Sequence, residues 1–246
     1  MKLLDRPGAA SILLVLILLL LWQVVFMAAG PMAIASPAST FTYLARHLVD
    51  LGPHVWATGQ AFAFALVIAI AGGLVLGLVT GLSAKAAETA EPLLMAANSI
   101  PKIALYPVVL LLFGIGLPAK VAFGAIHGII PVAIFTMNAC RGVPPVLLKT
   151  AAVLNLSPID RIRSILLPSA LPAVLTGVRL GFSLTLIGTI LGEMFGSQSG
   201  LGYLLMTSIG LQNTDIIMAV TVLLIAFAAS VSTALLSWER RLRRMR

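Results

Sequence analysis

The chain has 246 residues, of which 60% are hydrophobic and only 10% are charged, whereas about 25% are charged in a typical soluble domain. This composition excludes an ordinary soluble protein, and apolar blocks of about 20 residues predict several membrane spans in one helical bundle. The net charge of +8 does not indicate nucleic-acid binding, because five of the sixteen basic residues directly follow an apolar run and are typical of a membrane anchor: Arg240, Arg241, Arg243, Arg244 and Arg246.

The first apolar block runs from Ser11 to Gly30 and follows Lys2 and Arg6. This pattern is compatible with a cleavable signal peptide as well as with an uncleaved span. The block has Gln23 as its only strongly polar residue, and it is longer than the roughly 7 to 15 residues of a signal-peptide core. We therefore expect an uncleaved first helix, long enough to cross about 30 Å of hydrocarbon.

Hydropathy predicts five more spans and therefore six in all. Their approximate ranges are 55–82, 92–113, 121–137, 172–192 and 216–238. We expect an all-α integral membrane fold that divides into a first span with an external segment (1–53), a core of five spans (54–242) and a basic tail (243–246). Most basic residues outside the spans fall on one side, and the positive-inside rule places both termini in the cytoplasm.

Two segments are predicted on the external side. Residues 31–53 are polar and are expected to hold a short surface helix. Residues 193–215 contain four glycines and neither Lys nor Arg.

Two spans have unusual residues. The second carries Gly73, Gly77 and Gly81, whose four-residue spacing predicts close packing with another helix. The third carries Lys102 next to Pro101, and a lysine at that depth costs about 2.5 to 3.5 kcal/mol unless it snorkels, pairs or faces water. Two interpretations stay open, namely that Lys102 reaches the cytoplasmic interface or that it lines a transport pathway.

The cytoplasmic stretch from residue 141 to 168 is long, charged and interrupted by prolines. Pro144 and Pro145 suit the start of one helix, and the sequence SPID at 157–160 suits the start of another, with serine as N-cap and proline in the first turn. A plain connection needs only a few residues. We therefore predict two short helices joined at an elbow that forms a docking surface.

Nucleotide binding and catalysis have no visible motif. No G-x-x-x-x-G-K-[ST] pattern occurs, and residues 114–119 match a dinucleotide pattern only loosely and are predicted to be a turn. The scattered His47, His54 and His127 are expected at interfaces or in packing. Cys140 is the only cysteine, which excludes an intrachain disulfide and a cysteine zinc cluster and favours the role of a small buried hydrophobe.

The sequence TAAVLNL at 150–156, followed by ILLP at 165–168, resembles the EAA loop of ABC importer permeases. That family's pattern is roughly E-A-A, a glycine four residues later and an apolar-Leu-Pro ending. The likeness continues in order from about His54 to Leu242 and points to the branch that handles nitrate, sulfonate, taurine, bicarbonate and pyrimidine precursors. The supporting stretches are SIPKIAL (99–105), FGIG (113–116), LPSALP (167–172), GVRL (177–180), and Glu193 with GLGY (200–203).

In that family the helix bearing the two alanines inserts into a groove of the ATPase subunit and switches the permease between inward-open and outward-open states. Alanines permit close approach, and a contact shifts such an equilibrium only if it differs between the two states. The resemblance thus implies a coupling surface made of Thr150, Ala151, Ala152, Asn155, Leu156, Ser157, Asp160 and Arg161.

Two residues depart from the family pattern. Thr150 stands at the usual glutamate and Leu156 at the usual glycine, which normally permits a left-handed turn. Asparagine is the next best residue for positive φ, so we predict that the turn has moved to Asn155 or that the elbow opens without a left-handed residue. The missing glutamate suggests a heterodimer whose second permease carries the intact motif.

The resemblance implies a six-span, type I-like permease in the bacterial inner membrane, dimeric with an identical or a different second permease. Its implied partners are two ATP-binding subunits inside and a substrate-binding protein outside, with ATP and Mg held by the ATPase and no cofactor in this chain. The chain itself is expected to be no enzyme. Lys102 and Glu193 are the candidate pathway residues, and the implied solute is a small sulfonate-, taurine- or nitrate-like anion or a pyrimidine-like precursor.

Two other function classes are kept as alternatives. An ion-coupled secondary transporter also has broken spans and intramembrane charge, but this sequence has no evident inverted repeat and does have the two-helix loop. An intramembrane enzyme lacks paired catalytic groups here.

Overall fold

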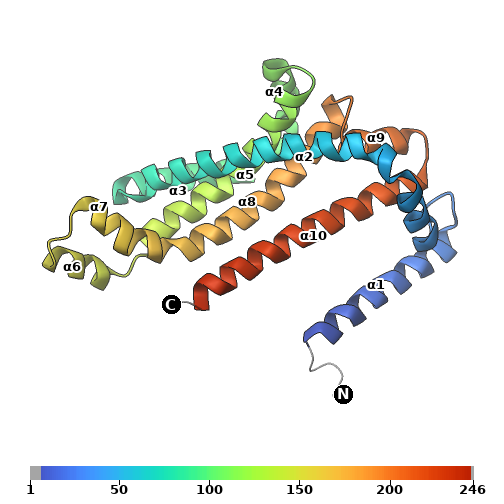
Figure 1. Cartoon of the computed structure of the whole chain (residues 1–246). Helices are drawn as coiled ribbons and strands as arrows, with labels where there is room; N and C mark the ends of the chain where they lie inside the picture. Colours follow the sequence, from blue (N-terminus) through green and yellow to red (C-terminus); the bar gives the residue numbers. More distant parts are fainter. Residues whose placement is uncertain (1–6, 245–246) are drawn as a thin grey trace.

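The computed structural model describes the backbone of residues 7–244, and all regular elements in this range are helical (Figure 1). In chain order the elements are α1 Pro7–Ala29, α2 Pro37–Gly81, α3 Ala84–Ser99, η1 Lys102–Leu105, α4 Tyr106–Phe113, α5 Leu117–Arg141, α6 Pro145–Val153, α7 Pro158–Arg161, η2 Ile162–Leu166, α8 Leu167–Gly196, α9 Leu201–Gly210 and α10 Thr214–Arg244. The all-α fold predicted from the sequence is confirmed.

Five helices in the described range are long and apolar enough to cross a membrane, and a bent pair supplies the sixth candidate. The predicted first, fourth, fifth and sixth spans correspond to α1, α5, α8 and α10. Helices α5, α8 and α10 extend beyond both of their predicted ends by a few residues, whereas α1 begins earlier than predicted and ends at Ala29, one residue before its predicted end. The prediction of six spans is met only if the bent pair counts as one.

The external segment 31–53 is not separate from the second span. Its helix begins at Pro37, where Ser36 Oγ accepts a hydrogen bond from Ser39 N at 3.0 Å, and continues to Gly81 as part of α2. The backbone leaves helical geometry only at His47 (φ −112°, ψ 19°). The predicted surface helix therefore exists, but it is joined to the span through a bend rather than through a loop.

The third span, predicted over 92–113, is broken in the structure, and its first helix already begins at Ala84. Helix α3 ends at Ser99, and the η1–α4 segment leaves at an angle of 84° (Figure 1). Pro101 causes the break, because it has no N–H to donate and disfavours helical geometry in Ile100, which is extended at ψ 131°. Pro92 and Pro107 do not break their helices.

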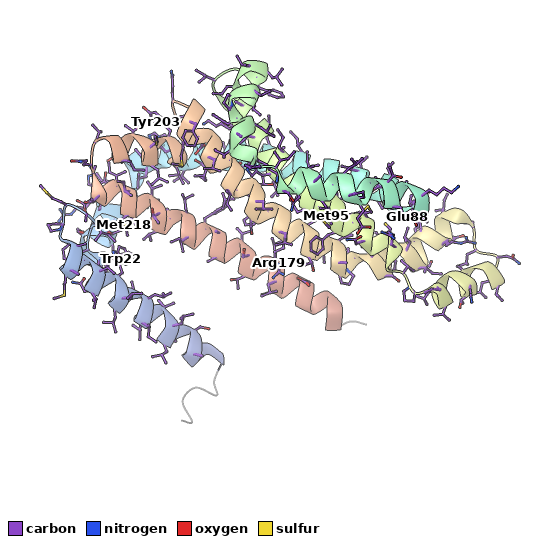
Figure 2. The ribbon with its side chains drawn as sticks, turned by 180° about the vertical axis from the view of Figure 1, so that it is seen from behind. Trp22, Glu88, Met95, Arg179, Tyr203 and Met218 are labelled. Carbon is purple, nitrogen blue, oxygen red and sulfur yellow. The ribbon has the colours of Figure 1, made fainter. Side chains whose placement is uncertain are left out.

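The core is formed where α5 packs between α2 and α8. A Cβ atom at Gly73, Gly77 or Gly81 would lie 2.8, 2.6 or 2.9 Å from a backbone carbonyl oxygen of α5. No side chain fits at these distances, so the predicted glycine packing is confirmed. Helix α1 lies outside this core and is attached through contacts such as the hydrogen bond from Trp22 Nε1 to the Ala35 carbonyl at 2.9 Å (Figure 2).

Candidate functional site

The elbow, which was predicted on the cytoplasmic side, consists of α6, α7 and the turn between them. Helix α6 ends at Val153 and is followed by a turn in which Asn155 has a φ of 47° and Leu156 N donates to the Ala151 carbonyl at 3.1 Å. A left-handed residue followed by this longer hydrogen bond is a Schellman ending, in which asparagine occupies the position that glycine usually takes. The prediction that the left-handed turn has moved to Asn155 is therefore confirmed.

The second half of the elbow begins with a side-chain cap. Ser157 Oγ accepts from Asp160 N at 3.2 Å and donates to Asp160 Oδ2 at 2.6 Å. From Ile159 the helical path continues to Gly196 as one 38-residue helix. A π-turn over Ile162–Leu166 lets it pass Pro168, which has no N–H to donate. The second half of the elbow is thus the N-terminal end of the same continuous helix that forms span α8.

The elbow leaves large apolar side chains exposed. Val153 is 81% exposed, and Val146, Leu154 and Ile159 are exposed as well, whereas Ala151 is fully buried. Polar residues surround them, since Thr150, Asp160 and Arg161 are exposed and Arg161 makes no ion pair with a described residue. The side chain of Ala152 lies outside the described part, as do the side chains of the arginine tail. Exposed apolar groups with a polar rim are typical of a docking surface.

Glu193 lies near the C-terminal end of α8, which the positive-inside rule predicts to be external, and is fully buried. Its Oε2 accepts hydrogen bonds from Thr58 Oγ1 at 2.7 Å and from Gly202 N at 3.0 Å. Thr58 Oγ1 in turn accepts from Leu201 N at 2.7 Å. The Leu201 and Gly202 amides belong to the first turn of α9. The Thr58 hydroxyl and the Glu193 carboxylate therefore cap the N-terminus of α9, one amide each.

Lys120 of α5 completes this cluster as the counter-ion. Its Nζ lies 3.4 Å from Glu193 Oε1 and donates to the Ser199 carbonyl at 2.7 Å, and Lys120 is only 3% exposed. A cavity of about 480 Å³ lies beside the pair, between α2, α5 and the loop before α9, and its polar walls include Gln60, Gln198 and Lys120. We call Thr58, Lys120, Glu193, Ser199 and Gly202 the external cluster.

The glycines of the 196–202 segment make room for the external cluster. Gly200 has φ of +113°, and a Cβ atom there would overlap the Glu193 carboxylate. A Cβ atom at Gly202 would overlap the Ile190 carbonyl. This glycine-rich segment is therefore a fitted part of the fold and not a flexible linker.

Lys102 lies at the break between α3 and α4, in the partly exposed 3₁₀ turn. Its Nζ donates to the Asn98 carbonyl at 3.1 Å, which places the ammonium on the open C-terminal end of α3. No carboxylate of a described residue pairs with it. Lys102 and Glu193 are thus in different places, and their role in a pathway stays a prediction.

Comparison with known proteins decides the family. The profile of the family described as binding-protein-dependent transport system inner membrane component matches residues 69–244. This match covers the C-terminal part of α2 from residue 69, all of α5 and α8, and the whole elbow. The chain belongs to this family. It is therefore a multi-pass inner-membrane permease of an ABC importer, and the resemblance inferred from the EAA-like loop is confirmed.

Relatives of the permease cover most of its length. A probable ABC transporter permease protein of Haemophilus influenzae is 29% identical, with 88% of this chain and 89% of the relative covered. A putative aliphatic sulfonates transport permease protein of Bacillus subtilis is 27% identical (85% and 77% covered), and the taurine transport system permease protein of Escherichia coli is 25% identical (78% and 70% covered).

Solved structures show the fold of the permease. The MetNI methionine ABC transporter in inward-facing conformations matches with a TM-score of 0.69 at 22% identity, over 80% of this chain and 98% of the other. An amino acid ABC transporter with histidines matches with a TM-score of 0.66 at 18% identity, over 82% and 98%. The fold is that of type I ABC importer permeases.

Sequence reasoning found the elbow of the permease but missed other residues. Neither Lys120 nor Thr58 was among the predicted site residues. A single basic residue in an external segment that is otherwise poor in charge was the available signal for Lys120. No signal existed for Thr58, because a threonine within an apolar helix is common. Within the described residues, no group of three potential metal ligands occurs.

Proposed function

We propose that this permease passes a small anionic solute of the sulfonate, taurine, nitrate or bicarbonate kind from an extracytoplasmic binding protein to the cytoplasm. A separate ATP-binding subunit, present in two copies and holding ATP and Mg, drives the cycle by docking on the elbow. A second permease subunit completes the pathway. A pyrimidine-like precursor is the alternative solute.

The elbow is the observation that carries this proposal. Its apolar side chains face the cytoplasmic side without a cover, although burial of each would be favourable by about 1.5 to 3 kcal/mol. Its second helix continues without interruption into α8, which reaches Glu193 of the external cluster. A displacement of the elbow by the ATPase would therefore be transmitted along one continuous helix that extends through the core.

The anionic solute is supported by the relatives and by charge. The names of several relatives specify aliphatic sulfonates, taurine, bicarbonate and nitrate, which are small and carry oxyanion groups. Lys102 brings a positive charge into the third span without a described carboxylate beside it. A cation in this setting favours an anionic passenger.

The test uses the permease co-expressed with its ATPase and binding protein in proteoliposomes. Val153→Asp should abolish co-purification of the ATPase and ATP-driven uptake, because it puts a charge into the docking surface. Met32→Asp is the matched control, since Met32 is 95% exposed but lies on the external side of α1. Uptake that runs on an ion gradient without ATP or partner chains would favour the secondary transporter instead.

The subunit composition has its own test. Thr150 lacks the charge of the usual glutamate, which led to the heterodimer hypothesis. A purified complex with two identical copies of this chain and full transport would contradict that hypothesis.

A further inference from the structure

The elbow lies at the opposite end of the bundle from α9, and its exposed charges are mostly positive (Figure 1). The charged residues are Lys149 on α6 and Asp160 and Arg161 on α7, and Arg163 follows directly after the elbow. All four are exposed. None of the three basic residues makes an ion pair with a described residue. The surface therefore carries positive charge that the described side chains do not neutralise.

The single acidic residue of the elbow is occupied within the elbow itself. Asp160 Oδ2 accepts a hydrogen bond from Ser157 Oγ at 2.6 Å. Asp160 also stands in the first turn of the helix that continues into α8, where the helix dipole favours a negative charge. A carboxylate held in this way stabilises the local fold, so the basic side chains are the charged groups that an incoming partner meets.

The basic side chains stand beside the exposed apolar ones. Lys149 lies three residues after Val146 and four before Val153 on α6, and these spacings place the three residues on one helix face. Arg163 follows Ile159 by four residues along the continuous helix. Val146, Val153 and Ile159 are all exposed. Apolar groups with charged groups at their edge are typical of a surface that a protein partner covers.

Membrane topology explains why basic residues occur in this part of the chain, but not where they stand. The positive-inside rule is satisfied by lysine or arginine anywhere in a short cytoplasmic loop. In the elbow, these residues alternate with apolar residues that lack a cover. A partner that covers the apolar groups also removes water from the neighbouring cations, which is unfavourable unless the partner supplies negative charge.

The shape of the elbow favours a protein groove over a membrane surface. A helix that lies on a membrane presents one continuous apolar face to the lipid. In the elbow, the exposed apolar residues come from α6 and α7, which are nine and four residues long and are joined by the left-handed turn at Asn155. The Schellman ending and the Ser157 cap hold this turn. The surface is therefore preformed and loses little conformational freedom when a partner binds.

We propose that the elbow is recognised by a groove of the ATP-binding subunit that has an apolar floor and an acidic rim. The floor receives Val153 and its apolar neighbours, and carboxylates of the rim face Lys149, Arg161 and Arg163. The exposed Thr150 fits this assignment, because a carboxylate at this position would stand next to Lys149 and face the acidic rim. The inference rests on the proposed function for the identity of the partner, whereas the charge that a partner must carry follows from the elbow itself.

The test measures binding of the purified ATP-binding subunit to the permease in lipid nanodiscs, at low salt and at about 1 M salt, where exposed charges are screened beyond about 3 Å. Lys149→Glu together with Arg161→Glu should raise Kd about tenfold at low salt, mainly through slower association, because like charges then face each other. The difference should disappear at high salt. Thr150→Glu should raise Kd about threefold at low salt, which keeps the test decisive if the double variant does not fold.

Two controls separate the charge preference from docking itself. Arg46→Glu makes the same charge change at an exposed position of α2 outside the elbow and should keep the original Kd. Val153→Asp should abolish binding at both salt concentrations, because salt does not restore a lost apolar contact.

The outcomes distinguish the acidic rim from the docking surface. If Val153→Asp abolishes binding but the charge variants keep their Kd at low salt, the acidic rim is wrong and the elbow remains the docking surface. Tighter binding of Thr150→Glu or of the double variant would mean a basic rim and would overturn the proposal. Normal binding of Val153→Asp would instead contradict the proposed function.

A membrane surface is the other anionic partner that a basic, apolar surface can bind. Lys149→Glu with Arg161→Glu should weaken ATPase binding in nanodiscs of phosphatidylcholine and also in nanodiscs that contain phosphatidylglycerol. Stronger binding of this variant in the anionic nanodiscs would show that lipid headgroups hold the elbow, and it would overturn the acidic rim.

Discussion

Two single residues with positive φ shape the elbow and the external cluster. Asn155 is left-handed at the elbow, and Gly200 has positive φ at the external cluster. The conformation of Asn155 was predictable, because asparagine tolerates positive φ and precedes Leu156, which stands where the family pattern has glycine. The second was not, because the sequence shows a glycine but not the carboxylate that would overlap a Cβ atom there.

Replacement of Asn155 by valine should weaken the elbow. A β-branched residue at φ 47° costs about 1 to 2 kcal/mol relative to residues that adopt this region readily, so the Schellman ending should open. We expect reduced ATPase stimulation by the loaded binding protein in the reconstituted complex. Leu156→Val is the matched control, because Leu156 has no positive φ and should keep near-normal stimulation.

Replacement of Gly200 by alanine should destabilise the permease by several kcal/mol. The added Cβ atom meets the Glu193 carboxylate in a backbone region that L side chains rarely adopt. Gly210→Ala provides the comparison, since nothing lies within 4 Å of a Cβ atom there. Thermal unfolding in detergent should show a large drop for the first variant and little change for the second; equal melting temperatures would mean that the 196–202 segment is not a fitted part.

At the level of elements, the spans were largely predictable and their breaks were not. Apolar runs located α1, α5, α8 and α10, because a lipid-spanning helix needs about 20 apolar residues wherever it packs. Pro101 was visible in the sequence, yet Pro92 and Pro131 lie inside intact helices. Whether a proline bends a helix depends on how neighbouring helices satisfy the freed carbonyl groups, and that information is not local. The external cluster was missed for the same reason, since it joins four separate segments.

The external cluster should behave as a buried ion pair that holds α9 on the core. Lys120→Met leaves Glu193 buried without its counter-ion, which costs about 3 to 5 kcal/mol, whereas adding Glu193→Gln should recover part of this loss. Arg141→Met breaks the exposed pair with Glu91 and should cost about 1 kcal/mol or less. Melting temperatures of the four proteins check this order. A double variant less stable than Lys120→Met would show that the two charges do not form a coupled pair.

At the scale of the whole molecule, the distribution of charge predicts the orientation across the membrane, and with it which end faces a cytoplasmic ATPase. The elbow carries Lys149 and Arg161 and is followed by Arg163, whereas the 193–215 segment carries no basic residue. The positive-inside rule therefore predicts that the elbow lies in the cytoplasm and the external cluster outside. In a Cys140→Ala background, Met32→Cys should react with a membrane-impermeant maleimide added to intact cells, because Met32 is 95% exposed and lies at the external end of α1. Val153→Cys should react only after the membrane is opened. The reverse labelling pattern would mean that the permease has the opposite orientation and that the elbow cannot contact a cytoplasmic ATPase.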